Sequence, residues 1–163
     1  MLSIRSAIIE DVPLLSAMIR ELAEFERDLN AVVTTEADLA RDGFGPDPKF
    51  RALIADWDNQ PAGYALFFDF YSTWRGRQLY LEDLFVRPQF RNRGIGKRLL
   101  AATARIAGDN NCHGMRWEVL DWNHTAIEFY KSLGVEFLDE WRLVLLKDEA
   151  LQRLAKSTSK RFS

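Results

Sequence analysis

The sequence predicts an α/β fold built on a mixed sheet, and three observations lead to this class. Segments that are typical of strands are interleaved along the chain with segments whose apolar residues recur at helical spacing. Of the 163 residues, 47% are hydrophobic and 28% are charged, which is the composition of an ordinary globular protein. No repeat or Pro-, Gly- or Ser-rich linker divides the chain, so we expect one domain over 1–163, with 157–163 as a flexible polar tail.

The N-terminal segment is expected to form one strand and two helices. Residues 3–8 alternate polar and apolar side chains, as a half-buried strand does. Asp11 is a typical N-cap, and the helical spacing of the apolar residues that follow predicts a helix to about Glu26. A threonine at 34 or 35 predicts the start of a second short helix, which ends near Asp42–Gly43.

Three strands are expected in the middle of the chain. Residues 50–57 and 62–70 are β-prone, and the turn between them predicts a hairpin. A turn at 75–77 then leads into an apolar strand over 78–86. Beyond it we expect a loop over 87–93, a helix over 94–109, a strand over 115–120, a helix over 125–133, a strand over 135–146 and a terminal helix over 149–155.

Composition excludes several classes of function. Lys plus Arg number 22 and Asp plus Glu number 24, and the resulting net charge of −2 argues against nucleic acid as a partner. With one cysteine, Cys112, and two histidines, neither a disulfide nor a Cys- or His-based metal site is expected. No apolar run approaches the roughly 20 residues of a membrane span, and the first residues do not resemble a signal peptide. We therefore expect a cytoplasmic protein with no membrane partner.

The most informative segment is the strand 79–86 with the loop that follows it. The loop reads Arg91-Asn92-Arg93-Gly94-Ile95-Gly96-Lys97, so two glycines open a helix beside basic side chains. Glycines allow a ligand to approach the backbone, and the amides at a helix N-terminus attract phosphate. The spacing matches neither a Walker A loop nor a dinucleotide-binding fingerprint, because position 98 is Arg and position 99 is Leu.

The pattern R-x-x-G-x-G after a strand that ends in Phe-Val resembles the acetyl-CoA signature of the GCN5-related N-acetyltransferase (GNAT) superfamily. Further matches over about 3–155 resemble the diamine acetyltransferase (spermidine/spermine N-acetyltransferase) family. The strings at 71–77 and 120–123 are most similar to its thialysine N-acetyltransferase branch. The resemblance implies a GNAT fold, with a mixed, mostly antiparallel sheet flanked by helices. It also implies acetyl-CoA as co-substrate, no metal, and a homodimer in which the segment 135–146 could take part.

The resemblance also implies the site residues. Catalytic roles fall to Tyr130 and Glu82. The residues expected to bind the co-substrate are Leu84, Phe85, Val86, Arg91, Asn92, Arg93, Gly94, Ile95, Gly96, Lys97, Asn123, Ala126 and Tyr130. The residues expected to line the amine pocket are Phe25, Glu26, Glu82, Arg116, Trp117 and Glu118.

These residue types suit amine acetylation. An alkyl amine is protonated at neutral pH, and removing its proton at pH 7 costs roughly 4.6 kcal/mol. A carboxylate can attract the ammonium group and accept its proton, and we expect Glu82 rather than Asp83 to do so, because neighbouring side chains on a strand face opposite ways. The phenol of Tyr130 would then protonate the departing thiolate. Glu82 as a solvated charge and Tyr130 as a core aromatic are the structural alternatives.

The acceptor is less sharply predicted than the reaction. Ser72 stands where polyamine-specific relatives have an acidic residue, which favours a thialysine-like amino acid or a short diamine over a long polyamine. Two other functions stay open at this point. One is acetylation of a protein lysine or N-terminus, and the other is a CoA-binding module without catalysis.

Overall fold

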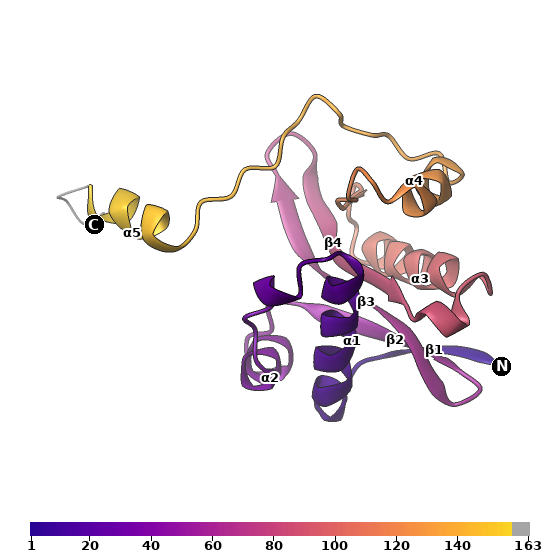
Figure 1. Cartoon of the computed structure of the whole chain (residues 1–163). Helices are drawn as coiled ribbons and strands as arrows, with labels where there is room; N and C mark the ends of the chain where they lie inside the picture. Colours follow the sequence, from indigo (N-terminus) through magenta and orange to yellow (C-terminus); the bar gives the residue numbers. More distant parts are fainter. Residues whose placement is uncertain (158–163) are drawn as a thin grey trace. The chain divides into compact units, whose positions relative to one another are not determined.

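The computed structural model describes residues 1–157 and confirms the predicted α/β class (Figure 1). The chain divides into two compact units, Met1–Glu118 and a second that begins at Val119, and each is described by itself. Of the tail expected at 157–163, only Ser157 lies within the described residues. The single-domain organisation stays a prediction.

The first unit contains the predicted strands and helices of the N-terminal two thirds, with ends that differ from the predicted ones by a few residues. Its strands are β1 (Leu2–Ser6), β2 (Arg51–Trp57), β3 (Gln60–Ser72), β4 (Gly76–Val86) and β5 (Met115–Arg116). Its helices are α1 (Val12–Phe25), α2 (Glu36–Phe44) and α3 (Ile95–Asp109), with short 3-10 turns η1 (Ile9–Asp11), η2 (Leu29–Ala31) and η3 (Pro88–Phe90). Thr35 caps α2 as expected, because its hydroxyl accepts the amide of Asp38.

The sheet is mixed and mostly antiparallel, as predicted. Its strand order is β1-β2-β3-β4-β5, and β1 to β4 pair antiparallel in succession. β5 runs parallel to β4 but pairs only at Leu79 and Tyr80. Beyond Tyr80, therefore, β4 has no strand partner on this side among the residues described. The strand predicted over 115–120 is correspondingly short.

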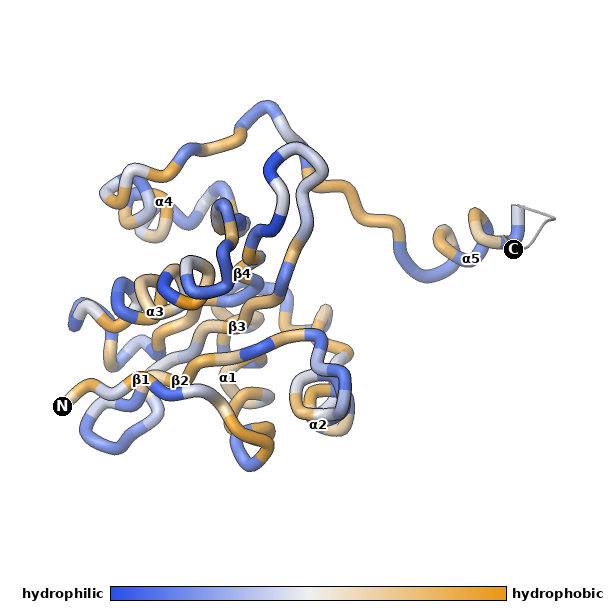
Figure 2. Tube along the Cα trace, turned by 180° about the vertical axis from the view of Figure 1, so that it is seen from behind, coloured by the Kyte–Doolittle hydropathy of each residue, from blue (hydrophilic) through white to orange (hydrophobic). Residues whose placement is uncertain are grey.

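Helices α1 and α3 cover opposite faces of this sheet (Figure 1 and Figure 2), and buried side chains lie on both faces. On one face, Leu15 and Met18 of α1 pack with buried residues of the sheet that include Tyr64 and Phe85. Strand residues that alternate with Tyr64 and Phe85 face the other side of the sheet, and several of them are also buried. The apolar stripe of α3 packs against this second face. Because both faces are covered, the orientation of β4 is fixed. Phe85 faces α1, and its neighbours along the strand face α3.

A β-bulge interrupts β4 at Glu82. Leu81 pairs with Phe67 and Asp83 pairs with Leu66, so Glu82 is the extra residue between two adjacent partners. A bulge of this kind breaks the strict alternation of side chains and turns a residue toward a new direction. The expectation that Glu82 and Asp83 must face opposite ways therefore does not apply at this position.

The second unit contains α4 (His124–Lys131) and α5 (Asp148–Lys156), close to the two predicted helices. No strand forms over the predicted range 135–146 within the described residues, which corrects that expectation. A strand requires a partner for its backbone groups, and its apolar pattern alone does not provide one. The apolar side chains of Leu143, Val144 and Leu145 are instead 76%, 86% and 77% exposed.

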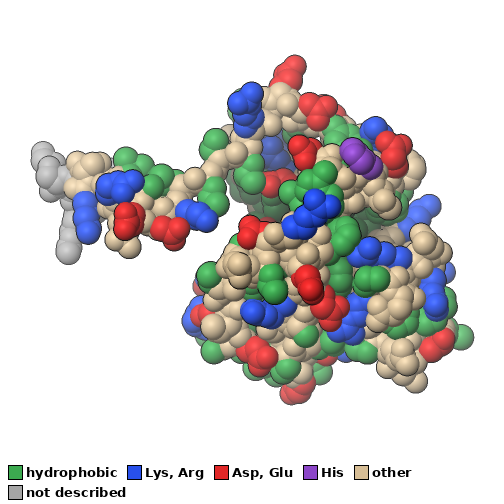
Figure 3. All heavy atoms as spheres, viewed as in Figure 1, with side chains coloured by type: hydrophobic (Ala, Val, Ile, Leu, Met, Phe, Trp, Pro, Cys, Tyr) green, Lys and Arg blue, Asp and Glu red, His purple; other side chains and the backbone are tan. Residues whose placement is uncertain are grey.

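Charged side chains of both signs are scattered over the face of the first unit that Figure 3 shows. On the face in Figure 3, Lys and Arg are interspersed with Asp and Glu, so this face has no broad basic area. Among the described helices, none is both long and apolar enough to cross a membrane.

Candidate active site

The loop after β4 has the geometry of an anion-binding site. η3 leads into two residues with left-handed backbone, Asn92 at φ 61° and Gly94 at φ 73°, and α3 begins at Ile95. Glycine adopts this conformation without steric cost, and asparagine tolerates it better than most residues. The first amides of α3 have no acceptor within the helix, so they and the positive end of the helix dipole are available to a phosphate.

The two glycines also leave the backbone open. A Cβ at Gly94 would meet no described atom within 4 Å, and one at Gly96 would meet only Val86 Cγ2 at 3.7 Å. Packing inside the described chain therefore does not require glycine at 96. Arg91, Arg93 and Lys97 are exposed around this opening, and the Arg93 guanidinium lies 5.0 Å over the ring of Trp57. An anionic cofactor fits this set of donors.

The end of β4 lies next to this loop. Arg87 N–H donates to Ala62 O of β3, so the alternation of the strand directs the Val86 carbonyl away from β3, toward the side without a strand. An extended ligand can add to such an edge as a further strand. Of the residues predicted for the co-substrate, the structure thus brings together Leu84, Phe85 and Val86 of β4 with the seven loop residues at 91–97.

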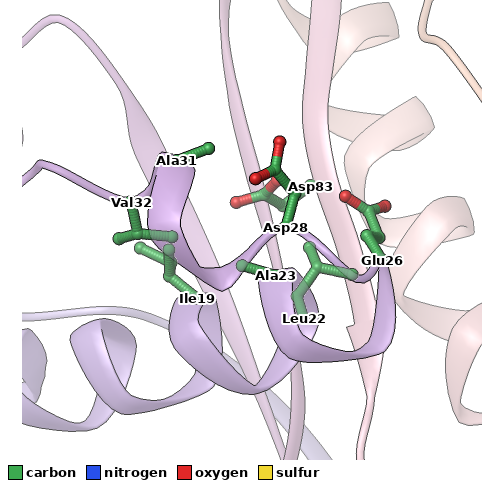
Figure 4. Close-up of a pocket in the computed structure, with 8 residues that line it drawn as sticks. All are labelled: Ile19, Leu22, Ala23, Glu26, Asp28, Ala31, Val32 and Asp83. Carbon is green, nitrogen blue, oxygen red and sulfur yellow. The ribbon is translucent and has the colours of Figure 1, made fainter.

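A pocket opens on the α1 side of the same strand. Its volume is about 240 Å³ and it is lined by Ile19, Leu22, Ala23, Glu26, Asp28, Ala31, Val32 and Asp83. Figure 4 shows the aliphatic side chains along α1 and the following turn, and the carboxylates of Glu26, Asp28 and Asp83 beyond them. Three carboxylates with no basic lining residue would attract a cation whose carbon chain contacts the aliphatic wall.

Asp83 is held in this pocket by Tyr64. The Tyr64 hydroxyl donates to Asp83 Oδ2 at 2.8 Å, and Tyr64 is completely buried between the sheet and α1. Desolvation raises the pKa of Asp83 to about 6, against the lowering effect of the Tyr64 hydrogen bond. The charge of Glu26 raises it further, and partial desolvation raises the pKa of Glu26 itself. A cationic ligand in the pocket would relieve this concentration of negative charge.

Glu82 does not line that pocket, but it lies in the same electrostatic environment. The residue remains exposed, yet nearby protein atoms partly desolvate its carboxyl group and raise its pKa. The charges of Asp83 and Glu118 raise it further. A carboxylate with a raised pKa is a better proton acceptor at neutral pH than an ordinary surface glutamate.

The other predicted amine-site residues lie on α1 and around β5. Glu26 lines the pocket, whereas Phe25 next to it contacts the guanidinium of Arg91 at 4.7 Å. Glu118 accepts a 2.5 Å hydrogen bond from the Tyr80 hydroxyl. Arg116 lies 5.9 Å over the Phe70 ring, and Trp117 is half-buried. Asp28, Tyr64 and the pocket role of Asp83 were not predicted. Asp28 reaches the pocket through the turn after α1, Asp83 follows the bulge in β4, and Tyr64 meets Asp83 through the pairing of β3 with β4.

The remaining predicted residues belong to the second unit. The Asn123 side chain caps α4 by accepting the amide of Ala126, and burial raises the pKa of Tyr130 to about 12. Tyr130 is thus protonated at neutral pH, as a proton donor must be. Within residues 1–157 no cluster of three or more His, Cys, Asp or Glu is placed to hold a metal ion.

Comparisons with known proteins agree with this geometry. The family model of the acetyltransferase (GNAT) family matches residues 16–135. Thialysine N-epsilon-acetyltransferase of Sus scrofa is 41% identical over 149 residues, which cover 85% of this chain and 88% of the relative. L-ornithine N5-acetyltransferase of Arabidopsis thaliana is 32% identical, covering 94% of this chain and 87% of the relative. Among solved structures, an integron cassette protein of V. cholerae is 27% identical, with a TM-score of 0.78 over 95% of this chain and 98% of that one.

Proposed function

The chain belongs to the acetyltransferase (GNAT) family, and from that premise we propose an acetyl-CoA-dependent N-acetyltransferase that acetylates a primary amine of a small molecule. One observation supports this most strongly. A single strand, β4, carries both the open edge that leads into the anion-binding loop and the acidic wall of a pocket that suits a cation. The strand is thus suited to hold an acyl donor and an amine next to each other.

Acetyl-CoA fits the residues at the end of β4. Its pantetheine arm would pair with the backbone of Leu84, Phe85 and Val86, and its pyrophosphate would bind the loop amides and basic side chains of 91–97. When bound, it supplies the acetyl group as a thioester. An amide of this strand can donate to the thioester carbonyl and stabilise the charge that develops there. Asn123 and Ala126 are proposed as further contacts on the strength of the family resemblance alone.

The carboxylates prepare the amine. Asp83, Glu26 and Asp28 attract the ammonium group into the pocket, and Glu82 accepts its proton directly or through a water molecule. The nitrogen lone pair then forms the bond to the acetyl carbon while the carbon–sulfur bond breaks, and the second proton that the nitrogen must lose to become an amide passes to solvent water. Tyr130, which is protonated at neutral pH, is our proposed proton donor to the departing thiolate.

We favour a short acceptor. The relatives named above act on thialysine and on ornithine, both amino acids with a terminal side-chain amine, and a diamine presents the same group. A pocket of about 240 Å³ suits such a chain better than an extended polyamine. Arg116, Trp117 and Glu118 are proposed to bind the rest of the acceptor.

We also propose that the enzyme works as a homodimer in the cytoplasm. The exposed apolar run from Leu143 to Leu146 supports the dimer, because apolar surface of this kind is usually covered by a partner. Cytoplasmic placement rests on the lone Cys112, which suits a reducing compartment.

A panel of acceptors tests the reaction. Purified protein and acetyl-CoA are incubated with thialysine, ornithine, putrescine, spermidine and a lysine-containing peptide, and release of the free thiol of CoA is followed. We expect the highest kcat/KM for thialysine, ornithine or putrescine. A preference for the peptide would indicate a protein acetyltransferase, and CoA binding without thiol release a non-catalytic module. A large preference for spermidine would contradict the short acceptor.

Glu82→Gln tests the proton acceptor. The substitution keeps the size of the side chain but removes its basic oxygen, so we expect kcat to fall by roughly 10²–10⁴. CoA affinity, measured by calorimetry, should change little, because Glu82 precedes the strand residues that bind the arm. Turnover within threefold of wild type would remove Glu82 from the mechanism.

A further inference from the structure

Two arginines attach the loop after β4 to one turn of α1. The Arg87 guanidinium forms a two-point ion pair with Glu21, with Nε–Oε2 at 2.9 Å and Nη2–Oε1 at 2.7 Å. The Arg91 guanidinium lies 4.7 Å over the ring of Phe25. Glu21 and Phe25 are four residues apart, so both attachments lie on one side of the helix.

The same turn of α1 forms part of the wall of the acidic pocket. Leu22 and Glu26, again four residues apart, line the pocket beside the stripe that holds the arginines. The C-terminal end of α1 therefore contacts the loop through Glu21 and Phe25, and it lines the pocket through Leu22 and Glu26. Phe25 is 37% exposed, so part of its side chain is open to solvent at the contact with the guanidinium.

Arg91 makes a second contact that a ligand would compete for. Its Nε donates to the Val86 carbonyl at 3.0 Å, on the open edge of β4. A pantetheine arm that pairs with this edge needs the same carbonyl, and a pyrophosphate in the loop attracts the same guanidinium. Occupancy of the loop would therefore draw Arg91 away from both Val86 and Phe25.

We propose that Arg91 and Phe25 couple the acyl-donor site to the amine pocket, an inference that rests on the proposed function. With Arg91 over Phe25, its positive charge lies at the residue before the pocket-lining Glu26 in the sequence, and in the proposed coupling this charge opposes a cationic amine. When CoA draws Arg91 to its phosphates, that charge leaves and the last turn of α1 is released from the guanidinium. The amine then binds more tightly, and by linkage CoA binds more tightly to the amine complex.

Calorimetry on the full chain tests this coupling. The dissociation constants of thialysine and putrescine are measured without CoA and with saturating CoA, which carries no acetyl group and so permits no transfer. We expect CoA to tighten amine binding at least fivefold in the wild type. Phe25→Leu keeps an apolar side chain but removes the aromatic face, so the ratio of the two constants should fall toward 1. Any direct loss of amine contact in this variant affects both constants and cancels in the ratio.

Arg51→Lys is the control, because it changes the arginine of another arginine–phenylalanine contact. Arg51 lies on β2, away from the loop, and its guanidinium is 5.1 Å from the ring centre of Phe67 on β3. This variant should keep the wild-type ratio. An unchanged ratio in Phe25→Leu, a wild-type ratio near 1, or no binding of either amine in the presence of CoA would overturn the coupling, provided that circular dichroism shows a folded variant. Failure of the wild type to bind CoA would overturn the proposed function and the coupling with it.

Discussion

At the scale of single residues, the neighbours Glu82 and Asp83 have different surroundings. Asp83 lines the pocket and accepts a hydrogen bond from the Tyr64 hydroxyl. Glu82 remains exposed, and the charge of Glu118 acts on its carboxyl group. Two carboxylates with raised pKa on one strand can thus divide the work, with Asp83 holding the cation and Glu82 accepting its proton. The bulge permits this arrangement because it breaks the alternation between them.

Asp83→Asn is expected to stabilise the fold near neutral pH. The folded protein holds the pKa of Asp83 at about 6, above the ordinary value of 3.8, so the folded state binds the proton more tightly than the unfolded state does. The unfolding free energy therefore falls as pH rises from about 4 to about 6, by about 3 kcal/mol from this group. Asparagine does not titrate, so the variant does not lose this unfolding free energy as pH rises. Urea unfolding should show a gain over wild type that is larger at pH 7 than at pH 4.

Amine binding should weaken in the same variant, because the pocket loses a negative charge. Asp109→Asn, at the exposed C-terminal end of α3, provides the control; it should leave amine binding unchanged and raise stability by at most about 1 kcal/mol, because it removes a negative charge from the negative end of the helix dipole. An equal effect of Asp83→Asn on stability at both pH values would mean that Asp83 does not titrate in this window.

At the scale of elements, the junction of β4 with α3 shows how backbone conformation prepares a binding site. Asn92 and Gly94 in left-handed conformation turn the chain sharply enough for α3 to begin with its amides exposed. Gly96 differs from Gly94, because its backbone is not left-handed and its surroundings would accept a methyl group. Its glycine is therefore better explained by the close approach of a ligand than by folding.

Gly96→Ala should separate stability from binding. Alanine in the first turn of a helix is favoured over glycine by up to about 1 kcal/mol, so the variant should be at least as stable as the wild type. Its methyl group would stand where the phosphates approach the amides, so CoA affinity should fall at least tenfold in calorimetry. Gly108→Ala, in the last turn of α3 with no described atom near its Cβ position, should be stabilising without any loss of CoA affinity. CoA affinity lost equally in both variants would contradict a role for Gly96.

Elements with strong local signals were predictable from the sequence, and elements defined by pairing were not. Thr35 marks the start of α2, and the glycines mark the start of α3, because caps and turns are local chemistry. The length of β5 and the bulge at Glu82 depend on hydrogen bonds between distant segments. For the same reason the sequence carried no signal for the pocket position of Asp83 or for Tyr64 as its partner, and the roles of Glu82 and the loop stay predictions.

At the scale of the whole molecule, charge and apolar surface are distributed differently. Acidic and basic side chains are mixed over the visible face of the first unit, whereas the second unit exposes a continuous apolar run. The segment 135–146 has the apolar pattern of a strand but no strand partner within residues 1–157. A partner from a second copy of the chain would satisfy its backbone and cover its side chains.

Val144→Asp should therefore separate the copies. Val144 is 86% exposed in the single chain, and a carboxylate there would be desolvated without a partner if the segment is buried between copies. Light scattering should give twice the chain mass of 18.9 kDa for the wild type and a single chain for the variant. Val33→Asp makes the same change at a residue that is 83% exposed in the first unit, and it should keep the wild-type mass. A wild type that is monomeric at tens of micromolar, or equal masses for the two variants, would contradict the homodimer through this segment.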